Sequence, residues 1–110
     1  MRRGDIYWIT NDGQTGCEQA NNRPAMIVSN DMCNTHSPVI QMVPLTHSRK
    51  KPLPVHVHVV IDGMHSTVLC EQICCVDRQR IQRYKGHLGE KDMRAVDRAL
   101  RIQLGLEGTT

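Results

Sequence analysis

Short apolar stretches, each ended by polar or turn-forming residues, fill the first two thirds of the chain. Residues 6–9 and the continuous apolar run 24–28 have the length and composition of strands. A third such stretch covers residues 39–45, and residues 67–76 supply one or two more. Further evidence lies in residues 55–61, where Val55, Val57 and Val59 alternate with His56, His58 and Val60. This period of two predicts a strand with one face in the core.

Residues 90–104 follow a different period. Their apolar positions are Met93, Val96, Leu100 and Leu104, which recur at spacings of three and four. That spacing predicts an amphipathic helix, and Gly105 stands where a helix commonly ends. The other faces of this helix carry Arg94, Arg98 and Arg101.

Five to seven short strands followed by a terminal helix predict a mainly β fold with a C-terminal helix (α+β), arranged as a small barrel or a curled sheet with the helix against it. The 110 residues suffice for one hydrophobic core and show no linker, so we expect a single domain over residues 1–110. Phe is absent, which leaves Ile, Val, Leu and Met to build that core. Burial between two copies of the chain would supplement so modest a core.

The formal net charge of +3 permits a polyanionic partner without requiring one. Its distribution is more informative, because no acidic residue lies between Met32 and Ile61. The same stretch contains Arg49, Lys50 and Lys51, with His47, His56 and His58 nearby. Such a segment can contact phosphates, although a solvated basic loop has the same composition.

The five cysteines are odd in number and include no CxxC pair at zinc spacing. No signal peptide precedes the first predicted strand, and the longest apolar runs are much shorter than a membrane span. We therefore expect reduced thiols in a cytoplasmic protein without a membrane anchor.

Several motifs occur in a fixed order along the chain. They are RGDIYW at 3–8, GCEQ at 16–19, RPA at 23–25, VSND at 28–31, HSP at 36–38, VPLT at 43–46 and VLCEQI at 68–73, then GHL at 86–88 before the terminal helix. Together they resemble the MazF/PemK toxin family from about Arg3 to Leu106. Several blocks at consistent spacing are more specific than any one of them.

This resemblance implies an SH3-like barrel of the MazF/PemK/CcdB kind that works as a homodimer without cofactor or metal. It implies the toxin of a type II toxin-antitoxin system, a sequence-specific endoribonuclease that cleaves single-stranded mRNA and is inhibited by an acidic, MazE-like antitoxin. The catalytic pair that it implies is Arg23 and Thr46. Residues expected to bind or orient the RNA are Cys17, Glu18, Gln19, His47, Ser48 and Gln72.

Two residues depart from the family pattern, which commonly has Ser at the position of Cys17 and Arg at that of Cys74. The first change weakens a hydrogen-bond donor and the second removes a cation that could meet a phosphate. Both bear on the target sequence and affinity more than on the reaction type.

Metal-free RNA cleavage uses the neighbouring 2′-hydroxyl as nucleophile and yields a 2′,3′-cyclic phosphate, or its hydrolysed 3′-phosphate, and a 5′-hydroxyl. The planar fork of Arg23 suits charge stabilisation on the phosphoryl oxygens, and Thr46 can donate to the same oxygens. Arginine is a poor base at neutral pH, so proton removal falls to a perturbed Arg23, to Glu18 or to His47. The sequence leaves this choice open.

Each of these candidate residues also has a purely structural interpretation. Arg23 could be a surface residue, Thr46 a turn residue, and Glu71 and Gln72 the cap of a strand edge. Tyr7 and Trp8 could stack on bases or serve the core, and His56 and His58 have the spacing of a metal pair without a third ligand. For the whole protein, the alternatives are a toxin of the same fold that poisons a protein such as DNA gyrase, and a non-catalytic RNA-binding barrel.

Overall fold

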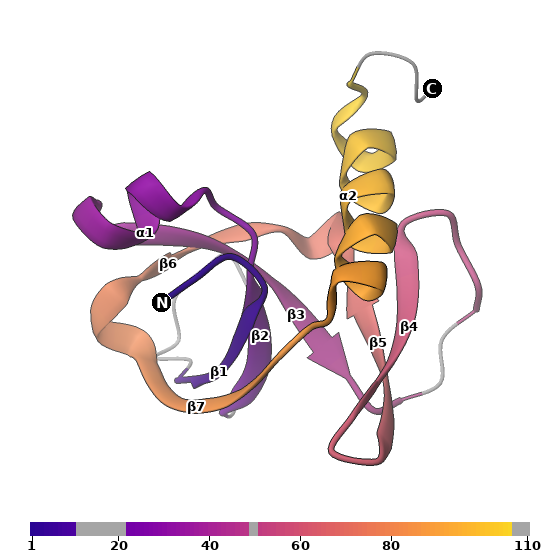
Figure 1. Ribbon diagram of the computed structural model, residues 1–110, viewed down its shortest axis with the longest axis horizontal. Helices are drawn as coiled ribbons and strands as arrows, with labels where there is room; N and C mark the ends of the chain where they lie inside the picture. The colour runs from indigo at the N-terminus through magenta and orange to yellow at the C-terminus, as the bar shows by residue number, and fades with distance from the viewer. Residues whose placement is uncertain (11–21, 49–50, 107–110) are drawn as a thin grey trace.

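The computed structural model describes residues 1–10, 22–48 and 51–106 of the chain. Within these residues it contains seven strands, two α-helices and two 3-10 turns (Figure 1). In chain order they are β1 (Asp5–Ile9), β2 (Arg23–Ile27), α1 (Asp31–His36), β3 (Val39–Thr46), β4 (His56–Ile61), β5 (Met64–Leu69), η1 (Cys70–Gln72), β6 (Cys74–Asp77), η2 (Arg78–Arg80), β7 (Ile81–His87) and α2 (Glu90–Leu104).

The strands form one antiparallel sheet in the order β4-β5-β3-β2-β1-β7, with β6 paired to β3 off this path. The eight-residue β3 is its centre, because it pairs with β2, with β5 near its end and with β6 near its start. The sheet curls on itself, and α2 stands beside β4 and η1 (Figure 1). The expected small barrel with a C-terminal helix is confirmed.

Alternation along β3 divides the core between the two faces of the sheet. Val43 and Leu45 face one cluster, which also contains Val96, Ala99 and Leu100 of α2. Ile40 and Met42 face a second cluster with Ile9, Ala25, Ile27 and Val76. Successive side chains of a strand point to opposite faces, so one central strand serves both clusters.

The terminal helix has the predicted bounds, Glu90–Leu104. It ends at Gly105, whose φ of 65° is a left-handed conformation that glycine adopts without steric cost. Val96 and Leu100 are buried as expected, but the expected burial of Leu104 is wrong, because 52% of this residue is exposed. Leu104 lies in the last turn, where α2 extends past the strands that cover its first turns (Figure 1).

Two elements were not expected from the apolar pattern. Helix α1 begins after Asn30, whose side chain accepts a hydrogen bond from the Cys33 amide at 2.9 Å, an ordinary N-cap. Strand β7 is mostly polar and pairs with β1 across two register shifts, so its sequence carries little periodicity. The N-cap of α1 is local, whereas β7 depends on pairing with a distant strand.

The cysteines differ in state. Cys33, Cys70 and Cys75 have free thiols, as expected, whereas Cys74 is disulfide-bonded, so the expectation of reduced thiols is wrong at that position. Burial raises the pKa of the Cys70 thiol to about 12. In the described part of the chain, neither helix is long and apolar enough to cross a membrane.

Candidate functional site

Arg23 and Thr46, far apart in sequence, lie opposite each other in the sheet. The β2–β3 register pairs Ala25 with Pro44. Followed two residues further, the same antiparallel register sets Arg23 at the start of β2 against Thr46 at the end of β3. Directly opposed residues of antiparallel strands project from the same face, so the structure brings the predicted catalytic pair together.

This row continues across two more strands. Thr46 pairs with Thr67 of β5, and Thr67 pairs in turn with His58 of the edge strand β4. The Nδ1 atom of His58 lies 3.2 Å from the hydroxyl of Thr67, which is almost fully buried. Arg23, Thr46, Thr67 and His58 therefore form a row of polar side chains on one face of four neighbouring strands.

Sequence reasoning did not assign Thr67 or His58 to the site. The alternation in residues 55–61 correctly directed His58 away from the core. Its position beside Thr67 depends on the β4–β5 register, and the position of Thr67 beside Thr46 depends on the β3–β5 register. Cross-strand register joins distant segments, and no motif in the sequence carries that information.

Arg23 is half-buried and anchored by one nitrogen. Its Nε donates to the carbonyl of Leu45 at 3.2 Å. Among the described residues, neither terminal nitrogen of its guanidinium has a hydrogen-bond partner, so the fork remains available. Desolvation by burial lowers the pKa of Arg23, and a desolvated cation attracts a phosphate more strongly than a fully hydrated one.

Thr46 has the opposite arrangement, with its hydroxyl oxygen occupied. It accepts a hydrogen bond from the Ser48 amide at 3.1 Å, where the chain turns away after β3. This contact is the one that the alternative interpretation of Thr46, as a turn residue, predicts. Because the oxygen accepts this bond, the hydroxyl proton can still be donated to a bound oxygen.

His47 and Ser48 follow Thr46 directly and both are exposed. The Nδ1 atom of His47 is 3.4 Å from the carbonyl oxygen of His65 and 3.3 Å from the hydroxyl of Ser66. These contacts hold the ring of His47 beside β5, one residue past Thr46.

These residues border a cavity of about 550 Å³ beside the row. It is lined by His47, Ser48, Pro52, His58, His65, Ser66 and Thr67. Among the residues that the structure describes, the lining combines imidazole and hydroxyl groups without a carboxylate, so these groups offer hydrogen bonds to an anionic or polar ligand.

Gln72 lies outside this row, exposed at the end of η1. Its neighbour Glu71 does not cap a strand edge but accepts a 2.7 Å hydrogen bond from Nε2 of His56. The other ring nitrogen of His56 lies 3.0 Å from the carbonyl of Lys51. With both nitrogens facing acceptors, His56 ties η1 to the segment that precedes β4.

Other predicted roles have mixed outcomes. Cys17, Glu18 and Gln19 lie outside the described residues, as do Arg49 and Lys50. Tyr7 packs edge-on against Tyr84 at 5.5 Å, and Lys85 lies 5.0 Å from the ring centre of Trp8. His56 and His58 turn to separate partners, and in residues 1–10, 22–48 and 51–106 no cluster of three metal-ligating side chains occurs.

Comparison with known proteins adds independent evidence. The sequence profile of a family described as PemK-like, MazF-like toxins of type II toxin-antitoxin systems matches residues 2–104. An Endoribonuclease MazF from Staphylococcus saprophyticus is 34% identical over 111 residues, covering 96% of this chain and 92% of that protein.

Solved structures agree. A crystal structure of MazF from Deinococcus radiodurans superposes with a TM-score of 0.80 at 27% identity, over 96% of this chain and 97% of the other. A mycobacterial endoribonuclease solved with its cognate antitoxin superposes with a TM-score of 0.82 at 23% identity, over 96% of both chains. This second likeness concerns the fold.

Proposed function

Because the chain belongs to the PemK-like, MazF-like family of type II toxins, we propose that it is the toxin of such a system and an endoribonuclease that cuts single-stranded mRNA at specific sequences. The observation that carries this proposal is the meeting of Arg23 and Thr46 at the end of β3, with the guanidinium fork and the hydroxyl proton both available. A toxin that acts only by binding a protein has no use for this pair.

In the proposed reaction the 2′-oxygen attacks the adjacent phosphorus while the bond from phosphorus to the 5′-oxygen breaks. The products are a 2′,3′-cyclic phosphate, or the 3′-phosphate after hydrolysis, and a 5′-hydroxyl. Negative charge grows on the non-bridging oxygens, where the two free nitrogens of Arg23 and the hydroxyl of Thr46 donate. Arg23 supplies positive charge at this point, so the mechanism that we propose does not use a metal.

Two protons must move in this reaction. The proton of the 2′-hydroxyl leaves as the bond to phosphorus forms, and the departing 5′-oxygen receives a proton. His47 is our candidate for the first transfer, because it follows Thr46 directly, is exposed and carries an imidazole that can accept a proton. Glu18 is the alternative acceptor. His47 and Ser48 also border the cavity beside Thr46, which supports their expected role in holding the RNA.

We further propose that the protein acts in the cytoplasm as a homodimer and is inhibited by an acidic, MazE-like antitoxin. Exposed Leu104 and Leu106 line a hollow of about 560 Å³ with Val28 and Ile73. Burial of these side chains against a second copy would supplement a core without Phe. An acidic segment that folds on binding would complement the cationic RNA site.

The test is incubation of purified protein with a long, unstructured RNA in EDTA, beside the Arg23→Ala variant. We expect discrete fragments with 5′-hydroxyl ends from the wild type and intact RNA from the variant. Intact RNA from folded, antitoxin-free wild type over several sequences would instead favour a toxin that poisons a protein target. Equal cutting by both proteins would keep the ribonuclease and reject the role of Arg23.

A further inference from the structure

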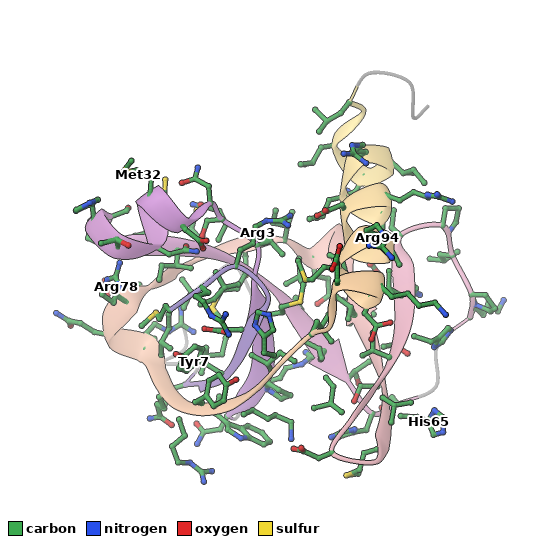
Figure 2. All side chains as sticks on the ribbon, in the orientation of Figure 1. Arg3, Tyr7, Met32, His65, Arg78 and Arg94 are labelled. Carbon is green, nitrogen blue, oxygen red and sulfur yellow. The ribbon has the colours of Figure 1, made fainter. Side chains whose placement is uncertain are left out.

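A second hollow lies between the edge strand β4 and the helix α2, outside the row of Arg23 and Thr46. Its volume is about 510 Å³. Three cationic residues of α2 line it, namely Lys91, Arg94 and Arg98, and Figure 2 shows Arg94 on this helix. His58 of β4 lines it from the strand side.

The three cations share one side of the helix, because residues three and four apart lie on the same face. All three are exposed. Arg94 has an ion pair with Glu90 at 3.0 Å, but both side chains are more than 60% exposed. Exposed pairs of this kind contribute little, so Arg94 remains available to a stronger anion. Within residues 1–10, 22–48 and 51–106, no carboxylate lines this hollow.

The hollow shares one lining residue, His58, with the cavity beside the proposed catalytic site. His58 lines this hollow and also the cavity beside Thr46, where its ring contacts Thr67. A path of hydrogen-bond donors and cations can therefore be followed from Thr67 through His58 of the edge strand to Lys91, Arg94 and Arg98 of α2. A linear polymer that carries one negative charge in each repeating unit matches such a path.

We propose that this path, defined by His58, Lys91, Arg94 and Arg98, binds the phosphate backbone of RNA nucleotides that flank the cleaved bond. The inference rests on the proposed ribonuclease function. It adds a part of the protein, the first turns of α2, that does not touch the reacting phosphate. The cations act through charge and carry no sequence information, so they raise affinity for long RNA of any sequence.

Salt dependence measures such contacts directly. Each phosphate neutralised on a single strand contributes about 0.7 to the slope of log affinity against log salt concentration. Replacing Lys91, Arg94 and Arg98 by Ala should lower that slope by roughly 2. Between about 50 and 200 mM salt, the wild-type affinity should then fall about 18-fold more than the affinity of the triple variant.

The probe is a fluorescent RNA of about 20 nucleotides with randomised sequence, 2′-O-methylated throughout so that no nucleophile is present. Anisotropy titrations compare wild type, the triple variant and Arg83→Ala. Arg83 is an exposed cation on β7, at the opposite edge of the sheet, and its removal should leave the slope unchanged. Alanine is a good helix former, so α2 should persist, and circular dichroism checks this.

A triple-variant slope equal to that of the wild type, or no RNA binding by the wild type, overturns the proposal. An unchanged RNA slope together with weakened binding of a polyglutamate peptide also overturns it and assigns the hollow to an acidic protein partner. The cleavage assay in EDTA is run on the same wild-type preparation. RNA cleavage by the wild type together with an unchanged salt slope in the triple variant rejects only the proposed path. A reduced slope in the triple variant without RNA cleavage by the wild type rejects only the proposed ribonuclease activity.

Discussion

Arg23→Lys separates the charge of Arg23 from its geometry. Lysine keeps the positive charge but has neither the Nε–H that donates to Leu45 at 3.2 Å nor a planar fork. In the proposed mechanism two terminal nitrogens of Arg23 donate to the phosphoryl oxygens, and the lysine variant supplies one flexible ammonium instead. Loss of a single preorganised donor to a developing negative charge typically lowers kcat by about 10²–10³, or roughly 3–4 kcal/mol. We expect a loss of that size in Arg23→Lys.

Single-turnover cleavage of a 5′-labelled RNA in EDTA is the appropriate assay, with protein in excess and varied to saturation. The rate at saturation reports the chemical step, and the half-saturating concentration reports binding. The lysine variant should lose rate while its half-saturating concentration stays near that of the wild type, because the charge is retained. Arg23→Ala should lose both. Arg83→Lys on β7 is the matched control and should match the wild type.

A lysine variant that cleaves at the wild-type rate at saturation would refute this reasoning. It would show that a cation near the phosphate suffices and that the anchor from Nε to Leu45 has no catalytic consequence. A variant with normal rate but much weaker binding would assign Arg23 to uniform binding of the RNA.

Three further predictions follow from the same geometry. Thr46→Val keeps the shape but removes the donated proton, so kcat should fall by about 10² with little change in RNA binding, as measured in the same assay. The raised pKa of Cys70, about 12, leaves almost no thiolate at pH 8. A thiol-reactive dye should therefore label exposed Cys75 in the folded protein and reach Cys70 only after unfolding. Equal labelling rates at the two cysteines would contradict this. Glu71→Gln weakens the 2.7 Å hydrogen bond to His56. Because Glu71 is about one third exposed, the free energy of unfolding in urea should fall by only roughly 1–2 kcal/mol. An unchanged urea midpoint would mean that the pair contributes nothing to stability.

The parts of the fold that the sequence predicts well are those with a regular local period. Alternation in residues 55–61 places Val57, Val59 and Ile61 in the core, and the spacing in residues 90–104 gives both bounds of α2. Leu104 shows the limit of this reasoning, because a helical period says which face is apolar but not how far the covering strands extend. Strand β7 has almost no apolar alternation, so its existence depends on pairing with β1.

The same distinction applies to the site. Resemblance to a family predicts Arg23 and Thr46 as the catalytic pair, and the β2–β3 register accounts for their proximity. Thr67 and His58 have no motif of their own and join the row only through two further registers. His56 has the spacing of a metal ligand in the sequence, yet its hydrogen-bond partners are Glu71 and the Lys51 carbonyl. The role of a histidine depends on which groups the fold brings next to it.

The central position of β3 has a consequence for how the protein can be switched off. Thr46 ends a strand that is hydrogen-bonded to three others and packed into both core clusters. Releasing β3 from the sheet disrupts both clusters, so its opening requires close to the full free energy of unfolding, and its interior amides should be among the slowest to exchange with deuterium. Local unfolding of β3 therefore cannot regulate this site without unfolding the protein. Silencing such an enzyme requires an inhibitor that covers the folded surface from outside.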